Sequence, residues 1–157
     1  MRLTRLERTF LVVSLITFSA LAAGQSIFEV RLVLDTPSAD TEPLPFTSPD
    51  GQTMVLNVQR SPLLDHSDVQ SATVAQDSDN GQPRIQIMLN PHGQERLADV
   101  SRQNLHKRVA VVIDGKVWVA PIIQAELTGG AVPIQGAFTS EQATDLARKI
   151  NAEAGRR

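Results

Sequence analysis

The chain contains no cysteine and no tyrosine among its 157 residues, and aromatic residues make up 4% of it. The lack of cysteine excludes a disulfide framework, a thiolate zinc site, an iron–sulfur cluster and a cysteine nucleophile. It also excludes lipoprotein-type lipid attachment, which requires a cysteine at the cleavage point. The formal net charge is −2. A mildly acidic chain is a poor candidate for binding nucleic acid, so we expect no nucleic-acid partner.

The sequence also lacks the common catalytic motifs. It contains no Gly-x-Ser-x-Gly elbow, no Ser-x-x-Lys, no His-Glu-x-x-His and no phosphate-binding loop. Residues 77–81 resemble the start of a calcium loop, but Met88 occupies the position that requires glutamate. We therefore expect no cofactor, no metal and no enzymatic activity. A hydrolase built on carboxylates, with Asp114 as its first candidate, is the enzymatic alternative.

The N-terminus has the layout of a secretory signal peptide. Arg2, Arg5 and Arg8 form a basic region, and an uncharged, mainly apolar run follows over residues 10–23. We predict a signal peptide over residues 1–22, cleaved after Ala22, which directs the chain to the periplasm or out of the cell. The apolar run is shorter than the roughly 20 residues that cross a bilayer. An uncleaved inner-membrane anchor is the alternative, and we expect membrane contact only through such an anchor.

The rest of the chain divides into an entry segment, residues 23–62, and a larger domain, residues 63–157. In the entry segment, hydrophobic patterning predicts strands over residues 28–34 and 54–59. Between them, residues 35–49 contain four prolines and are predicted to form a loop or linker, because proline disrupts helix interiors and central strands. These prolines are Pro37, Pro43, Pro45 and Pro49.

The larger domain combines hairpins and helices. Hairpin turns are predicted at Asp79-Asn80-Gly81 and at Asp114-Gly115. One helix begins after Asn90, and another follows a capping box that starts at Thr139. The predicted strands cover residues 71–76, 84–89, 109–113, 117–123 and 131–135. The expected fold class is α+β, with an antiparallel sheet built from hairpins and two helices packed on one face.

Residues 117–123 contain the candidate binding residues. Pro121 cannot donate to a sheet ladder, so this strand must bulge or reach an edge there. Alternation places Trp118, Ala120 and Ile122 on one face. Trp118 is either a filler of the core or its rim, or part of an exposed strip that grips extended polypeptide. The hairpin edges offer a second mode, in which a client adds a strand by backbone pairing.

Several residues around this hairpin are assigned structural roles. Four glycines are expected to serve backbone geometry, through a positive φ or a close approach. They are Gly115, Gly129, Gly130 and Gly136. Asp114 completes the hairpin turn, Phe138 is expected to anchor the final helix in the core, and the Thr139 hydroxyl is expected to cap that helix.

Three motifs follow one another in the second half of the chain. They are Asp-Gly-Lys-Val-Trp-Val-Ala-Pro-Ile-Ile from residue 114, Leu-Thr-Gly-Gly from residue 127, and Ile-Gln-Gly-Ala-Phe-Thr-Ser-Glu-Gln-Ala from residue 134. Together with Asn-Gly-Gln-Pro and Asn-Pro-His-Gly upstream, this set resembles the head part of the first periplasmic domain of SecD, a subunit of the protein-export accessory complex SecDF. The resemblance covers about residues 63–152. It departs at Val119, where the family usually has a small polar residue, and at Trp118, which is larger than the usual aliphatic residue.

The resemblance implies a function for the head alone. No later hydrophobic run follows, so we do not expect the proton-conducting membrane bundle of SecDF in this chain. The implied function is a non-enzymatic exported domain, accessory to protein translocation, that binds unfolded or exported polypeptide or Sec and envelope proteins. The alternative is an orphan secreted domain that reuses the fold as an inhibitor or a small-ligand binder.

Overall fold

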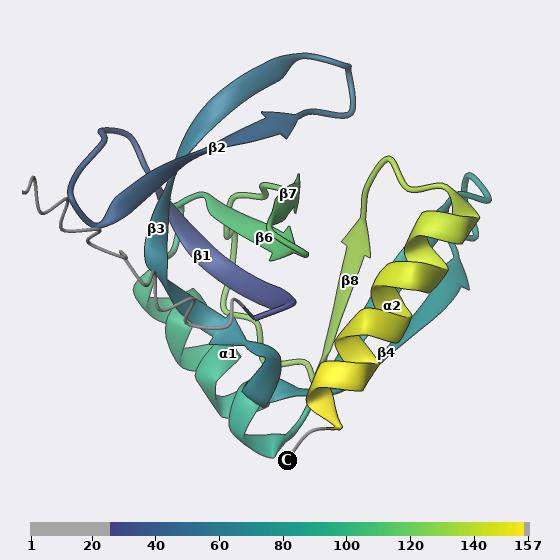
Figure 1. The fold of residues 1–157 in the computed structure, drawn as a ribbon. Coiled ribbons are helices and arrows are strands. Elements are labelled where there is room, and N and C mark those ends of the chain that lie inside the picture. Colours follow the sequence, from purple (N-terminus) through teal and green to yellow (C-terminus); the bar gives the residue numbers. More distant parts are fainter. Residues whose placement is uncertain (1–25, 156–157) are drawn as a thin grey trace, which may run out of the picture.

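The computed structural model describes residues 26–155, which fold into two antiparallel sheets and two α-helices (Figure 1). The predicted signal peptide and its cleavage site lie outside these residues. The five-stranded sheet has the order β2-β3-β1-β6-β7, and the three-stranded sheet has the order β4-β5-β8. The strands are β1 Phe28–Leu34, β2 Thr41–Thr47, β3 Thr53–Asp65, β4 Val69–Gln76, β5 Pro83–Leu89, β6 Val109–Ile113, β7 Lys116–Val119 and β8 Ala131–Gln135.

The α+β class and the antiparallel pairing are confirmed, but the strands form two sheets where one was predicted. A 3-10 turn, η1 (His66–Asp68), leads the chain from the end of β3 directly into β4, and this turn separates the sheets. Helix α2 (Ser140–Ala154) packs on β4 and β5, whereas α1 (Pro91–Gln103) contacts η1, β3 and β5. The helices are therefore not two neighbours on one face of one sheet.

The prediction of a loop over residues 35–49 is wrong for its second half. Thr41–Thr47 is strand β2, which pairs with β3 along its whole length. Pro43 and Pro45 are tolerated because β2 is an edge strand. The two prolines are two residues apart, so their backbone nitrogens face the same side of the strand. Both nitrogens can therefore face away from β3, where the ladder needs no N–H donor.

The five-stranded sheet separates two apolar cores. It curls so that its edge strands β2 and β7 approach each other without pairing. The curl encloses a smaller core of Phe46, Leu56, Val58, Ala110, Val112, Val117 and Ala120. The opposite face contributes to a larger core, shared with the three-stranded sheet and both helices. Strand β6 alternates between the cores and is buried at every residue, which explains why residues 109–113 are apolar throughout.

Both helices begin where the sequence predicts. The Asn90 side chain accepts a hydrogen bond from the backbone N of Gly93 at 2.9 Å, and Thr139 forms a reciprocal capping box with Gln142. Helix α2 buries Ala143, Leu146, Ala147, Ile150 and Ala154. The caps satisfy backbone N–H groups that a helix start otherwise leaves without partners.

A polar junction joins η1 to the start of α1. The Asp68 side chain is fully buried and lies 2.9 Å from Nδ1 of His92 and 3.1 Å from a guanidinium nitrogen of Arg96. Its carboxylate also accepts a hydrogen bond from the backbone N of Asp65, and its carbonyl oxygen accepts one from the backbone N of Asn90. A buried carboxylate needs such partners, because an unpaired one costs several kcal/mol. The junction therefore fixes the turn between the sheets against the first helix.

Candidate functional site

Residues 116–123 run along the outer edge of the five-stranded sheet. The first four form β7, which pairs with β6 and shows a register shift between Val111 and Val112. Beyond Val119 the chain stays extended, since the carbonyl oxygen of Pro121 accepts from the backbone N of Val109 and Ile123 N donates to Lys107 O. Regular strand β7 ends at Val119, so Pro121 lies beyond it and its lack of an N–H breaks no hydrogen bond of that strand. The strand is thus irregular at Pro121, as expected.

Trp118 is half-buried and held by three contacts. Its indole Nε1 donates to the carbonyl oxygen of Ile113 at 3.2 Å, and its ring stacks on Phe138 with the centroids 4.7 Å apart. The Lys116 ammonium lies 4.3 Å from the ring centroid. These contacts place one side of the indole on the larger core, while its remaining surface borders a hollow.

The predicted common face of Trp118, Ala120 and Ile122 is not formed. Trp118 and Val119 both pack against the larger core, whereas Ala120 belongs to the smaller one. Ile122 points outward with 42% of its surface exposed. The register shift explains the difference, because an irregularity in the ladder breaks the strict alternation on which the prediction depended.

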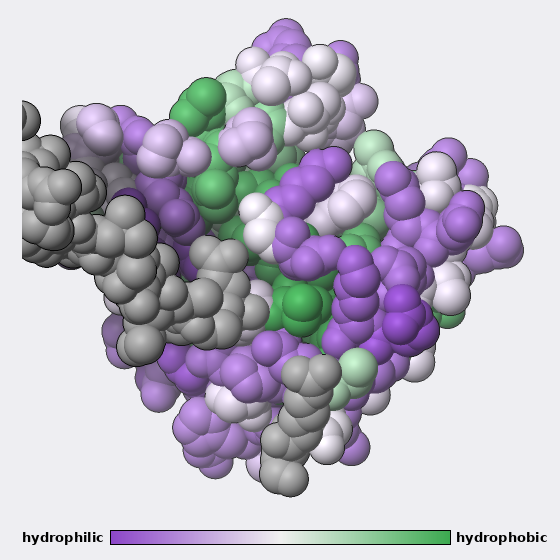
Figure 2. All heavy atoms as spheres, viewed as in Figure 1, coloured by the Kyte–Doolittle hydropathy of each residue, from purple (hydrophilic) through white to green (hydrophobic). Residues whose placement is uncertain are grey.

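Three hollows surround residues 116–123. The apolar hollow, about 350 Å³, lies between α1, β6 and the segment after β7, and includes Leu97, Val109, Pro121, Ile122 and Leu127 in its walls. The tryptophan hollow, about 560 Å³, is bordered by Phe46, Pro49, Trp118, Ala120, Pro121 and Gly136. In Figure 2, hydrophobic side chains gather between the β2–β3 lobe and α2, flanked by hydrophilic ones.

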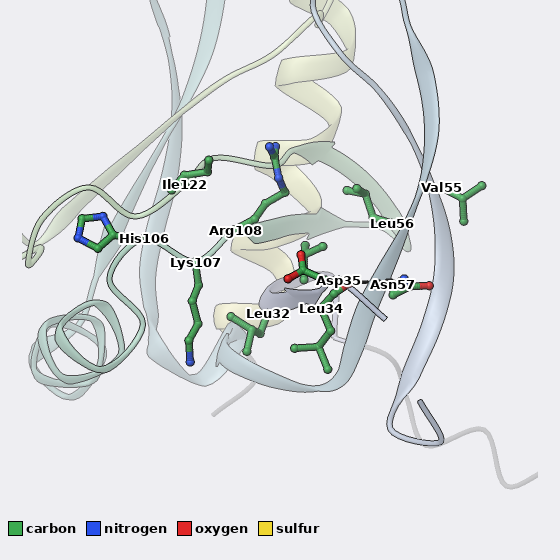
Figure 3. Close-up of a pocket in the computed structure, with 11 residues that line it drawn as sticks. Leu32, Leu34, Asp35, Val55, Leu56, Asn57, His106, Lys107, Arg108 and Ile122 are labelled. Carbon is green, nitrogen blue, oxygen red and sulfur yellow. Dashed lines mark hydrogen bonds between the residues drawn. The ribbon is translucent and has the colours of Figure 1, made fainter. Parts of the chain in front are cut away.

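The third hollow, the basic hollow, has a volume of about 600 Å³. Figure 3 shows its walls: the end of β1 and the middle of β3 face His106, Lys107 and Arg108, with Ile122 beside them. Arg108 donates to the carbonyl oxygen of Ala120 at 2.8 Å, and the Lys107 ammonium donates to Asn104 Oδ1 at 3.2 Å. Ile122 lines both this hollow and the apolar hollow.

The remaining predicted residues lie around the hollows rather than inside one site. Gly115 has a φ of 74° in the hairpin turn, and a Cβ on Gly136 would lie 2.9 Å from the Phe138 ring. A Cβ on Gly130 would meet Gln94, whereas Gly129 has neither a positive φ nor a neighbour that a Cβ would meet. Phe138 is buried in the larger core.

Asp114 occupies the hairpin turn with a φ of 53°, away from the three hollows. Its carboxylate binds the Lys149 ammonium of α2 at 2.6 Å, and this hydrogen bond is the main cause of the raised pKa of Lys149. Asp145, the second partner of Lys149, has a lowered pKa, chiefly because Arg148 donates to it. The carboxylate considered for catalysis is therefore engaged in an exposed ion pair.

The sequence patterns did not point to the cations Lys107 and Arg108 or to the end of β2, which line the hollows. Lys107 and Arg108 directly follow His106, and this run of three basic residues before a buried strand was the available sign. Phe46 and Pro49 were missed because the proline-rich segment was predicted to be a loop. No group of three or more histidine, aspartate or glutamate side chains within residues 26–155 is arranged to hold a metal ion.

The fold is an α+β module with hollows beside a sheet edge. The chain belongs to the SecDF P1 head subdomain family, whose pattern matches residues 41–154. Among curated relatives, the SecD translocase subunit of Sebaldella termitidis is 41% identical over 92 residues, which cover 59% of this chain and 22% of the relative. The SecDF subunit of Thermus thermophilus is 37% identical over 86 residues, covering 55% of this chain and 12% of the relative.

Solved structures give the same result. A SecDF structure, described as a membrane component that enhances protein export, superposes with a TM-score of 0.63 at 26% identity, covering 82% of this chain and 63% of the other. SecDF in a form termed super-membrane-facing gives 0.62 at 26% identity, covering 81% of this chain and 19% of the other. The chain thus spans less than a quarter of these two curated relatives. None of the helices among residues 26–155 has the length and apolar character needed to cross a membrane.

Proposed function

We propose that this chain is a periplasmic, non-enzymatic module of protein export that binds unfolded polypeptide through the hollows around residues 116–123. Family membership supports the export role, because the relatives are translocase subunits. The observation that carries the binding role is that one extended segment forms a wall of the apolar and tryptophan hollows and contributes Ile122 to the basic hollow. An extended client lying along this segment has apolar recesses on either side of it.

The size and polarity of the hollows suit weak, repeated contacts. The apolar hollow is lined almost entirely by aliphatic side chains, including Leu97 and Val109. Burying one leucine or phenylalanine side chain is worth about 2 kcal/mol, so a single filled hollow gives low affinity. A client that fills two or three hollows binds more tightly, and it still dissociates readily when one contact is lost. A translocation accessory requires such reversible binding.

Binding through side chains is favoured over strand addition at the free edges. Edge strand β2 contains Pro43 and Pro45, and edge strand β8 contains Pro133. Each proline removes an N–H donor that an added strand would need, which is a common way of protecting sheet edges. Edge strand β4 contains no proline, but the side-chain amide of Asn151 in α2 already bonds the backbone N and O of Ala72 there. The fourth edge, β7, lies against β2. The hollows are therefore the better docking features.

Site-specific photocrosslinking in the periplasm tests the proposal. A crosslinking residue replaces Ile122 or Leu127, both exposed at the hollows, and in the matched control it replaces exposed Asn80 in the β4–β5 turn. We expect a stalled export substrate to be captured from positions 122 and 127 and not from position 80. Equal capture from all three positions, or none from any folded variant, would contradict the proposal.

A small-ligand binder is the second candidate. The observation that favours it is the apolar hollow itself, whose 350 Å³ falls within the range of small-molecule sites. Its one buried hydroxyl, on Ser101, already accepts from the backbone N of Leu127 and donates to the carbonyl of Ala98. A ligand would find few polar groups to orient it. Tight one-to-one binding of an apolar small molecule that displaces peptide would favour this function over the first.

A further inference from the structure

We infer that the surface around residues 116–123 selects polypeptide segments in which acidic residues flank apolar ones. The inference rests on the proposed function and names the class of client. The observation that leads to it is the placement of the positive charges that have no carboxylate partner. Within residues 26–155, most arginine and lysine side chains form ion pairs with carboxylates of the protein. Most of those that form no ion pair line the hollows.

The unpaired cations can be identified one by one. Across residues 26–155, Arg31, Arg60, Arg96, Arg102, Arg148 and Lys149 each contact a carboxylate. Within the same residues, no carboxylate lies at ion-pair distance from Arg84, Lys107, Arg108 or Lys116. Three of these four line the hollows: Lys107 and Arg108 the basic hollow, and Arg108 and Lys116 the tryptophan hollow. In a chain of net charge −2, three of the four cations without a carboxylate partner therefore lie at two hollows that share Arg108.

The geometry leaves these cations able to bind a ligand. Arg108 uses one guanidinium nitrogen on Ala120 O, and its guanidinium has further N–H donors. Lys107 is held only by a long hydrogen bond to Asn104, and Lys116 lies over the Trp118 ring. Lys107 and Arg108 line the basic hollow together with Ile122, although the Lys107 side chain extends away from Ile122 (Figure 3), and Lys116 lines the tryptophan hollow together with Trp118.

Acidic groups at the same surface are few. Asp35, which lines the basic hollow, is the one carboxylate residue in the described walls of the three hollows. The balance of charge is therefore positive. A client whose apolar side chain enters the apolar hollow places its flanking residues near Lys107 and Arg108, because Ile122 borders both hollows. Carboxylates are favoured at those flanks, and lysines are disfavoured by like-charge repulsion.

Peptide binding to the purified full chain tests the inference. Three fluorescent peptides share one apolar centre of leucine, valine and phenylalanine and differ in their flanks, which are aspartate, serine or lysine. We expect the affinities to fall in that order, by about threefold to fivefold for each exposed ion pair gained or lost. We also expect the differences to shrink as salt is raised, because exposed charges are screened. Fluorescence anisotropy at low and near-physiological ionic strength measures both effects.

Variants separate the charges from the apolar contacts. Lys107→Gln with Arg108→Gln should reduce the ratio between the affinities for the aspartate-flanked and the serine-flanked peptides. Because Arg108 also holds Ala120, Lys107→Gln with Lys116→Gln is measured alongside, and circular dichroism checks folding. Arg84→Gln, which removes an unpaired cation outside the hollows, is the matched control and should change nothing.

The outcomes distinguish the two proposals. If all three peptides bind equally, the charge preference is wrong and the polypeptide-binding function stands. If none of the peptides binds, both the charge preference and the proposed polypeptide-binding function are wrong. If the chain binds anionic phospholipid vesicles through Lys107 and Arg108, and acidic peptide does not compete, the surface recognises lipid and the inference is overturned. Loss of preference in both double variants, but not in Arg84→Gln, supports it.

Discussion

Replacing Gly93 with alanine should destabilise the protein, although alanine is the better helix former. Gly93 lies in the first turn of α1, where a Cβ would stand 2.3 Å from the carbonyl oxygen of Asp68 and 2.9 Å from its Cβ. Atoms cannot approach so closely, so η1 and α1 must separate by about 1 Å. That movement strains the hydrogen bond from Asn90 N to Asp68 O and the contacts of the buried carboxylate with His92 and Arg96.

Helix propensity and the clash with Asp68 change the free energy of unfolding in opposite directions, so the sign of the measured change tells which of them dominates. Helix propensity alone predicts a gain of up to about 1 kcal/mol. Overpacking of a filled interior costs about 1–3 kcal/mol, and weakened junction contacts add to that cost. We expect a net loss of about 2 kcal/mol in the free energy of unfolding, measured by urea denaturation of the full chain. Gly129→Ala, where a Cβ would meet nothing within 4 Å, is the control and should be neutral. A Gly93→Ala variant as stable as the parent would refute the reasoning.

Two further predictions concern pH and the single tryptophan. Burial raises the pKa of Asp65, but hydrogen bonds from Ser67 and the charge of Arg96 outweigh it, so the pKa lies below its usual 3.8. The stability that this carboxylate contributes should be complete above about pH 4 and lost as pH falls through the lowered pKa; the difference in unfolding free energy between the parent and Asp65→Asn should therefore shrink on acidification. Trp118→Phe keeps an aromatic ring against Phe138 but loses the hydrogen bond to Ile113 O, and thermal denaturation should show a loss of about 1 kcal/mol. An unchanged melting temperature would mean that the indole N–H is equally well satisfied by water.

Local patterns in the sequence predicted most of the elements. Strand β1 and the starts of both helices follow from hydrophobic periodicity and from the caps at Asn90 and Thr139. These features depend on residues close together in the chain. Which strands pair with one another depends on residues far apart in the chain, so the separation into two sheets was not predicted. It depends on η1 and the buried Asp68, whose side-chain partners His92 and Arg96 are more than 20 residues away.

The candidate site was predicted in part for a similar reason. The sequence selected residues 117–123, and those residues do border the hollows. Alternation failed there because the register shift opposite Val111 and Val112 cannot be recognised from residue types. Lys107 and Arg108 gained significance only when the fold brought them beside Ile122, a residue on a different segment. Basic residues near apolar strands are common, and their lack of carboxylate partners is a property of the folded chain.

The burial of β6 on both faces has a consequence for the way the protein comes apart. Val109, Val111 and Ile113 belong to one core, while Ala110 and Val112 belong to the other. Because both cores pack on β6, moving this strand to fill a cavity in one core opens a gap in the other. We therefore expect the two cores to unfold in a single transition. We expect a movement of β7, the partner of β6, to reach both cores through that strand.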